Sequence, residues 1–159
     1  MVTWCSAAAA DAFYSCPDVL FQMKIKKVIV FTDGAAEPNP GPAAIGAVIK
    51  DEQGKVITTI SQSIGRATNN QAEYWAIITA MEEAIKLGTT HIELKSDSEL
   101  VVRQINGIYR VKKLELKPLY QKVKHLQGLL QGFTVTYIPR WQNAEADRLA
   151  SLALGLPVD

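Results

Sequence analysis

The sequence predicts a single α/β domain whose sheet begins with antiparallel strands and continues with parallel ones. In the first half, apolar and β-branched runs are separated by short turn sequences, as in antiparallel hairpins. In the second half, strand patterns alternate with patterns of helical period, as in parallel strands joined by helices. The length of 159 residues suits one domain with one core.

The first half is predicted to contribute three antiparallel strands. Its opening run is continuously apolar and β-branched, as in a central strand buried on both faces, and it ends at Asp33 and Gly34. Residues 37–42 hold three prolines and are predicted to form a loop, whereas residues 51–54 supply hairpin-turn chemistry. The predicted strands cover residues 28–31, 43–50 and 56–64.

The longest predicted helix follows these strands. Thr68 and Gln71 fit a capping box, and Gly88 supplies the stop. Glu73 lies four residues before Ile77 and therefore shares a face with the apolar positions of the helix. We expect a first-turn glutamate on that face to point toward protein rather than water.

Two further strands and three further helices are predicted in the second half. One short strand runs into Asp97, and the last helix is capped by Asn143 and closed by Gly155. The predicted strands cover residues 92–94 and 133–138, and the predicted helices cover residues 98–105, 116–131 and 144–154.

The composition excludes several classes of protein. Hydrophobic residues make up 48% and charged residues 21%, which is typical of soluble globular domains. No apolar run approaches the roughly 20 residues of a membrane-spanning helix. The formal net charge is +1, so a nucleic-acid partner would have to be held by local patches rather than by the overall charge.

Residues 1–22 differ from the rest of the chain. They contain both cysteines and no Lys or Arg, so they lack the basic start of a secretory signal. We expect the fold to start at Met23, with residues 1–22 a dispensable extension and residues 23–159 the domain. A cysteine-free domain fits the reducing cytoplasm, and nothing in the sequence implies an obligate protein partner, so we expect a monomer.

Four carboxylates occur in separate segments, each where a small α/β fold would turn it inward. Like charges do not gather in a fold without a counterion, and carboxylates are the hard oxygen ligands that Mg²⁺ and Mn²⁺ prefer. Two such ions about 3.5–4 Å apart could clamp the attacking and leaving oxygens at phosphorus. The set therefore predicts metal-dependent phosphate chemistry. Its members are Asp33, Glu73, Asp97 and Asp147.

Each acid also has a structural interpretation. Asp33 before Gly34 fits a turn, although the Pro-rich segment after it is too long for a tight hairpin. Glu73 would favour the positive N-terminus of a helix. Asp97 could be a helix N-cap, and Asp147 could be a first-turn or surface charge. The four acids are persuasive only as a set.

The motifs around these acids resemble, in order, those of type 1 ribonuclease H. They read Thr-Asp-Gly-Ala, Thr-Asn-Asn-Gln-Ala-Glu, Ser-Asp-Ser and Asn-Ala-Glu-Ala-Asp-Arg-Leu-Ala, and the resemblance covers about residues 27–153. It implies a ribonuclease H-like fold, with a five-stranded mixed sheet flanked by helices. It also implies a two-metal endonuclease, with Mg²⁺ or Mn²⁺ held by the four acids. The substrate would be the RNA strand of RNA–DNA hybrids, cut to leave 5′-phosphate and 3′-hydroxyl ends.

The resemblance further implies contacts with the substrate. Asn69 and Asn70 would touch the backbone and sugar edges, with helix capping as the alternative for both. Glu99 would sit near a 2′-hydroxyl, the group that distinguishes RNA from DNA. Ser98 and the backbone at Gly34, Ala35 and Ala36 could serve the same purpose.

Two segments depart from the family pattern. Many relatives carry a histidine in a loop before the last acid, whereas residues 139–143 hold none and resemble a shorter loop of some bacterial and archaeal members. Arg140 could hold a phosphate there but cannot act as a base at neutral pH. Many relatives also have a basic helical protrusion. The corresponding connection here is short but holds Arg110, Lys112 and Lys113, which suit either phosphate contact or a solvated loop.

The sequence leaves two other functions open. One is a protein that binds hybrids without cutting them, although such a protein would gain nothing from negative charge facing phosphate. The other is an exonuclease, resolvase or integrase on the same fold. Asn69, Asn70 and Ser98 favour RNA over that alternative, but only moderately.

Overall fold

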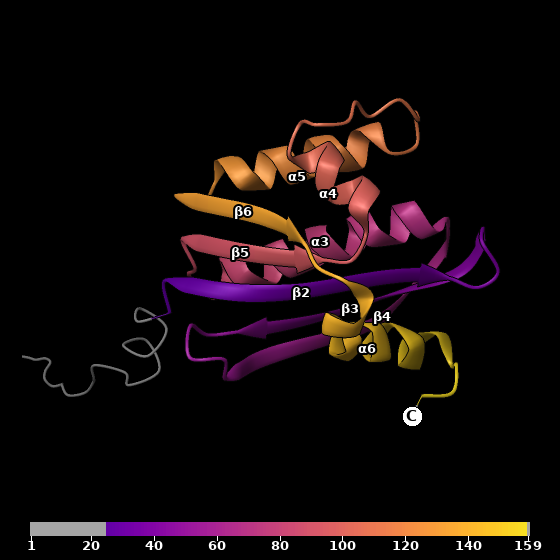
Figure 1. The fold of residues 1–159 in the computed structure, drawn as a ribbon, viewed down its shortest axis with the longest axis horizontal. Helices are drawn as coiled ribbons and strands as arrows, with labels where there is room; N and C mark the ends of the chain where they lie inside the picture. The colour runs from indigo at the N-terminus through magenta and orange to yellow at the C-terminus, as the bar shows by residue number, and fades with distance from the viewer. Residues whose placement is uncertain (1–24, 159) are drawn as a thin grey trace, which may run out of the picture.

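Five strands form one mixed sheet in the computed structural model, which describes residues 25–158 (Figure 1). The strand order is β4-β3-β2-β5-β6, with antiparallel pairing among the first three strands of the chain and parallel pairing of β2 with β5 and of β5 with β6. The predicted fold class is confirmed, whereas the prediction for residues 1–22 lies outside the described residues. The strands are β2 (Lys27–Ala36), β3 (Gly41–Lys50), β4 (Val56–Ala67), β5 (His91–Ser96) and β6 (Gly132–Tyr137).

The helices lie on different sides of this sheet, with α6 apart from α3, α4 and α5 (Figure 1). Adjacent residues of a strand face opposite sides, and partners across an antiparallel pair face the same side. Gly34 of β2 contacts α3, whereas Gly46, which pairs with Asp33, contacts α6. The helices are α3 (Asn69–Lys86), α4 (Glu99–Ile105), α5 (Lys117–Gly128) and α6 (Ala144–Leu154), with a short 3₁₀ helix η1 (Arg140–Gln142) before α6.

The first hairpin is tighter than predicted. Strand β2 does not end at Asp33 and Gly34 but runs on to Ala36, and Pro42 lies inside β3. The Pro42 carbonyl accepts the Glu37 backbone N–H at 3.0 Å, so the hairpin closes around the prolines even though proline cannot donate. Asp33 is therefore a strand residue, and its interpretation as a turn residue is wrong.

The strand buried on both faces is β3 rather than β2. Residues 43–49 are all buried, whereas Ile29 and Phe31 of β2 are only half-buried. The Lys50 ammonium lies 5.0 Å from the centre of the Phe31 ring. The face of β2 at Phe31 is therefore covered by a long charged side chain rather than by apolar side chains of a helix.

Helix ends follow the predicted chemistry in part. Thr68 and Gln71 form the predicted capping box of α3. Ser98, not Asp97, is the N-cap of α4, so the interpretation of Asp97 as a cap is wrong. Asn143 occupies the predicted N-cap position of α6 but makes no side-chain cap bond, and its Nδ2 donates to the Thr32 carbonyl oxygen instead. Within the described residues, no helix is long and apolar enough to cross a membrane.

Candidate functional site

The four predicted acids line one cleft of 340 Å³ at the end of the central strands. Asp33 comes from β2, Glu73 from the first turns of α3, Asp97 from the segment just after β5, and Asp147 from the first turn of α6. Because β2 and β5 are parallel neighbours, their carboxyl ends meet at the same edge, and this brings residues 64 positions apart into one site.

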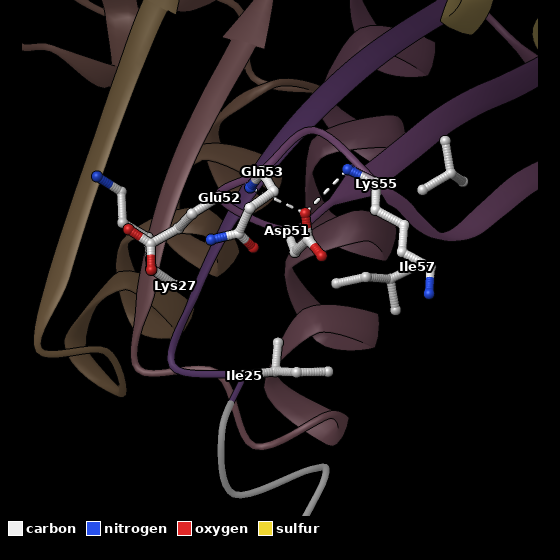
Figure 2. Close-up of a pocket in the computed structure, with 8 residues that line it drawn as sticks. Ile25, Lys27, Asp51, Glu52, Gln53, Lys55 and Ile57 are labelled. Atoms are coloured by element: carbon white, nitrogen blue, oxygen red, sulfur yellow. Dashed lines mark hydrogen bonds between the residues drawn. The ribbon is translucent and has the colours of Figure 1, made fainter.

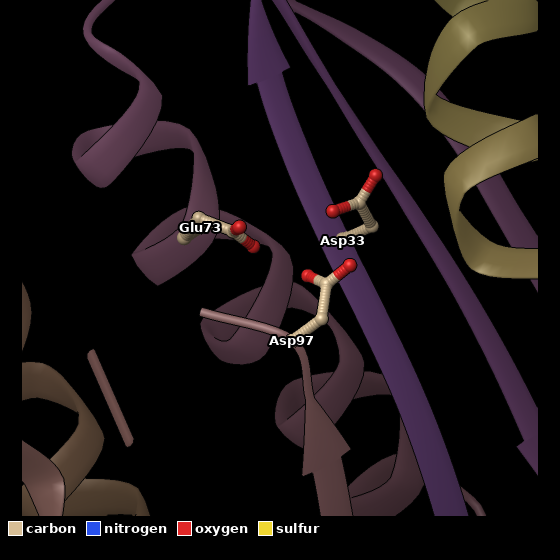
Figure 3. Close-up of side chains that lie close together, drawn as sticks. All are labelled: Asp33, Glu73 and Asp97. Atoms are coloured by element: carbon tan, nitrogen blue, oxygen red, sulfur yellow. The ribbon is translucent and has the colours of Figure 1, made fainter. Parts of the chain in front are cut away.

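Three of these acids form a tight cluster. Asp33, Glu73 and Asp97 each offer a carboxylate oxygen, and the three oxygens lie within 4.8 Å of one another. Figure 3 shows the three side chains turned toward a common space from β2, α3 and the end of β5. Asp147 lines the same cleft without belonging to this cluster, and one of its oxygens lies 3.7 Å from the Arg140 guanidinium.

Two glycines allow the helices to approach closely enough to deliver these acids. A Cβ at Gly34 would collide with the backbone of Ala72 and Glu73, and the Gly34 N–H donates to Glu73 Oε1 at 3.0 Å. A Cβ at Gly46 would collide with the Ala146 carbonyl oxygen, next to Asp147. Glycine inside a strand often marks such an approach of another backbone. Gly46 was not predicted as part of the site, because residues 43–50 have only the pattern of a buried strand.

The electrostatics of the cluster favour a bound cation. Burial raises the pKa of Asp33 to about 8, and the charge of Asp97 and a hydrogen bond with Asp147 add to the effect. Burial also raises the pKa of Glu73 well above its ordinary range, with the charges of Asp33 and Asp97 contributing. The pKa of Asp97 is raised by burial and lowered in part by Arg140. Each shift reports a carboxylate that lacks sufficient positive charge around it.

The donor set fits a hard divalent cation. The cluster offers carboxylate oxygens from three separate elements, with a fourth carboxylate in the same cleft. Oxygen-only ligands suit Mg²⁺ or Mn²⁺ rather than zinc, which favours nitrogen and sulfur. We infer that the cluster binds a divalent metal. The inward orientation predicted for Glu73 is confirmed by its place in the cluster.

The predicted substrate residues fall into separate places. The acid cleft includes Gly34, Ala35, Asn69 and Arg140. A second hollow, of 520 Å³, includes Asn70, Arg110, Lys112 and Lys113.

Two of the predicted substrate residues lie in neither hollow. Ser98 is the N-cap of α4, and Glu99 is held by Arg103, whose Nε and Nη2 both lie 2.9 Å from one Glu99 oxygen.

Asn69 and Asn70 are not caps, because Thr68 fills that position. The Asn69 Oδ1 accepts the Ala36 N–H at 2.7 Å, and the Asn69 N–H donates to Asn39 Oδ1 at 3.0 Å. Asn69 therefore ties the start of α3 to the tip of the first hairpin. Capping is thus wrong as the explanation of this pair.

Ala36, whose backbone was among the predicted substrate contacts, also lines the acid cleft, whereas sequence reasoning missed Glu37 and Tyr137 there. Tyr137 is 49% exposed and pairs with Ser96 at the end of β6. The signal for Tyr137 was its position at the end of a strand parallel to the one that runs into Asp97. Such strand ends meet at one edge of the sheet.

A separate hollow of 420 Å³ lies at the other end of β2, beneath the turn between β3 and β4 (Figure 2). Asp51 Oδ1 accepts the backbone N–H groups of Gln53 and Lys55 at 2.9 Å and so shapes the turn. Lys27, on the wall of this hollow, precedes Asp33 by six residues, which is about 20 Å along a strand. This hollow is therefore distinct from the acid cleft.

Comparisons with known proteins show the family of the chain. A family profile described as reverse transcriptase-like matches residues 31–153. Ribonuclease HI of Halobacterium salinarum is 40% identical over 128 residues, which cover 80% of this chain and 64% of that protein. A bifunctional protein of Mycobacterium tuberculosis is 40% identical over 129 residues, 80% of this chain. The chain spans only 35% of the length of that mycobacterial relative.

Solved structures show the same likeness in three dimensions. The crystal structure of RNase H1 from Halobacterium salinarum has a TM-score of 0.80 at 40% identity, covering 81% of this chain and 98% of that one. LC11-RNase H1, isolated from compost by a metagenomic approach, was solved in complex with an RNA/DNA hybrid. This structure has a TM-score of 0.78 at 41% identity, covering 80% of this chain and 96% of that one. A ribonuclease H of Sodalis glossinidius is also 35% identical over 80% of this chain and 85% of that protein, and together these likenesses show that the chain belongs to the ribonuclease H family.

Proposed function

We propose that the chain hydrolyses the RNA strand of RNA–DNA hybrids as a metal-dependent endonuclease, leaving 5′-phosphate and 3′-hydroxyl ends. The observation that carries the proposal is the meeting of Asp33, Glu73 and Asp97 within 4.8 Å in one cleft. A family relative bound to an RNA/DNA hybrid supports the choice of substrate. We propose Mg²⁺ as the metal, two ions per site, with Mn²⁺ as a substitute.

Asp33, Glu73, Asp97 and Asp147 are the proposed metal ligands. When bound, divalent cations would lower the pKa of a coordinated water and supply positive charge to the scissile phosphate. The protein holds the ligands in place before any cation arrives, because Asp33, Glu73 and Asp147 stand on different helices and strands around one sheet and Asp97 directly follows β5. Preorganised ligands of this kind need little rearrangement during the reaction.

Arg140 is the proposed holder of the scissile phosphate. Its side chain is 81% exposed at the rim of the acid cleft, 3.7 Å from Asp147. A guanidinium in this position can bind a phosphate oxygen through two N–H groups, but it keeps its proton at neutral pH. Arg140 therefore serves for binding and charge, not as the base that the family histidine would supply.

The remaining proposed contacts divide between the two strands of the hybrid. Asn69 and the backbone at Gly34 and Ala35 lie in the acid cleft and would face the RNA strand. Among the described hydrogen bonds, none uses the Asn69 Nδ2, so this donor is available for a sugar edge. Ser98 makes no cap bond, which leaves its hydroxyl available for a 2′-hydroxyl. Glu99 is the weaker candidate because Arg103 engages its carboxylate.

The second hollow is the proposed contact with the DNA strand. Arg110, Lys112 and Lys113 bring positive charge to it, and Asn70 and Tyr109 add a polar and an aromatic group. Basic residues beside an aromatic ring suit the phosphates and sugars of a nucleic-acid backbone. This local patch would supply the positive charge that the formal net charge of +1 does not provide.

The test is cleavage of an end-labelled RNA–DNA hybrid with Mg²⁺, with Mn²⁺ and with EDTA, beside double-stranded RNA and double-stranded DNA. We expect loss of the RNA strand alone, dependent on metal and abolished in Asp33→Asn. A 5′-phosphate on the downstream product, detected by ligation, would support the proposed ends. Absence of cleavage with either metal by a folded protein would reject the proposal and favour a protein that only binds hybrids.

We also propose that the protein is a monomer in the cytoplasm. Light scattering would test the oligomeric state, and cell fractionation would test the location.

A further inference from the structure

Asn143 is buried at the acid site but does not act as the helix cap that its position suggests. It is 1% exposed and stands at the N-cap of α6. An N-cap asparagine ordinarily accepts a backbone N–H from the first turn, whereas this one makes no such bond. Its Nδ2 donates instead to the Thr32 carbonyl oxygen at 2.8 Å, across 111 residues of sequence.

This contact connects α6 to the strand that carries Asp33. Thr32 immediately precedes Asp33 in β2. The Asn143 carbonyl accepts the Asp147 N–H at 3.1 Å, so Asn143 begins the helical turn that presents Asp147. One buried asparagine therefore bonds next to two of the four acids, through its side chain beside Asp33 and through its backbone at Asp147.

The oxygen end of the same amide shows that packing alone does not explain the residue. Within the described part of the chain, Asn143 Oδ1 is buried and has no hydrogen-bond partner. A buried, unsatisfied carbonyl is unfavourable, and an apolar side chain of similar size would avoid it. The feature that requires an asparagine is therefore the donor end, which bonds the Thr32 carbonyl oxygen.

We propose that Asn143 is a positioning residue that holds α6 against β2, so that Asp147 stays in register with Asp33 and Asp97 for shared metal binding. When no cation is present, the carboxylates that are ionised repel one another, and this repulsion favours a position of α6 farther from the sheet. A neutral donor opposes that displacement without adding charge to the site. The catalytic consequence rests on the proposed function, but the effect on metal affinity does not require hydrolysis.

The test compares Asn143→Ser with a matched variant, Asn106→Ser. Serine can still cap α6 but is too short to reach Thr32. Asn106 makes the same kind of bond, from Nδ2 to the Val135 carbonyl oxygen at 3.2 Å, away from the acid cleft. Mn²⁺ affinity of the substrate-free proteins would be measured by calorimetric titration, and kcat and KM on the hybrid would be measured separately. Thermal unfolding in EDTA would report folding.

We expect Asn143→Ser to weaken Mn²⁺ binding by about 10-fold or more, as for other residues that orient metal ligands, and to lower kcat with little change in KM. Asn106→Ser should leave Mn²⁺ affinity and kcat unchanged. A folded Asn143→Ser with wild-type Mn²⁺ affinity, even if its melting temperature falls, would overturn the proposal. If the serine variant does not fold, Asn143→Thr provides the same comparison, because threonine also caps and fills more space.

The outcomes separate this inference from the proposed function. Weaker Mn²⁺ binding in Asn143→Ser supports the positioning role even if the wild-type protein cuts no hybrid. Cleavage by the wild-type protein together with unchanged metal binding in Asn143→Ser rejects the positioning role and leaves the proposed function standing.

Discussion

Replacing Asp33 by asparagine should stabilise the metal-free protein while abolishing cleavage. Burial, Asp97 and Asp147 raise the pKa of Asp33 to about 8 from an ordinary value of 3.8. The unfolded chain releases the Asp33 proton near pH 4, whereas the folded protein keeps it until about pH 8. Since the unfolded state binds fewer protons in this range, the wild-type protein loses stability as pH rises through it.

The size of the expected stability gain follows from the difference between the ordinary pKa of Asp33, 3.8, and the pH of the experiment. Each pKa unit corresponds to about 1.4 kcal/mol, so at pH 7 the unfavourable contribution of Asp33 is at most about 4 kcal/mol. The real gain should be smaller, because Asp33, Glu73 and Asp97 titrate together, so that the raised pKa belongs to the three carboxylates and not to Asp33 alone. We expect Asp33→Asn to be more stable than wild type by roughly 1–4 kcal/mol at pH 7 in EDTA.

The assay is urea unfolding of both proteins in EDTA at pH 4.5 and pH 8. The stability difference should be small at pH 4.5 and should grow toward pH 8. Adding Mg²⁺ should stabilise the wild-type protein and close much of the gap, while Asp33→Asn should respond weakly. Glu52→Gln is the control, because Glu52 is an exposed acid in the turn between β3 and β4.

The reasoning fails if Asp33→Asn is less stable than wild type at pH 8 in EDTA. It also fails if the difference between the two proteins is the same at both pH values, because the gain would then not come from ionisation. Either result would mean that Asp33 contributes to the fold as a structural hydrogen-bonding group.

Four further changes have defined outcomes. Gly46→Ala should destabilise the protein by about 1–3 kcal/mol and lower kcat, because the new methyl group displaces α6 at Ala146. Gly128→Ala should do neither, because Gly128 has open space around it, and urea unfolding and cleavage rates would check both variants. Arg140→Gln should lower kcat/KM at least 10-fold and move the acidic limb of the pH–rate profile to higher pH, because Arg140 lowers the pKa of Asp33, Glu73 and Asp97. An acidic limb at the same pH as in the wild-type protein would contradict this electrostatic role of Arg140. Lys112→Ala with Lys113→Ala should raise KM for the hybrid and reduce its salt dependence without changing kcat, and an unchanged KM at low salt would count against contact with the DNA strand. Removal of residues 1–22 should leave the melting temperature and the cleavage rate unchanged, and loss of either would show that the extension is part of the domain.

The order and type of the elements could be predicted from local patterns. Strand alternation, the Thr68–Gln71 capping box and the glycine stop at Gly88 depend on neighbouring residues only. Strand ends were less predictable. Asp33 and Gly34 resemble a turn locally, but pairing of Asp33 with Gly46 and of Gly34 with Ile45 extends β2 to Ala36.

The candidate acids were also predictable as a set, because four motifs in order are specific even when each alone is weak. Their grouping was not predictable. Asp33, Glu73 and Asp97 form the tight cluster, whereas Asp147 lies beside Arg140 in the same cleft. The distances between the carboxylate oxygens depend on how closely α3 and α6 approach the sheet. Gly34 and Gly46 decide that approach.

The sequence by itself determined the fold class, the family resemblance and the identity of the four acids, since these depend on residue types and their order. The tertiary structure alone decided what the polar residues touch. It divided the predicted substrate contacts between two hollows, paired Glu99 with Arg103, and directed Asn143 to Thr32 rather than to its own helix. The physical reason is that hydrogen bonds and charges act over a few ångströms in space, and partners such as Asn143 and Thr32, 111 residues apart, become neighbours only in the folded sheet.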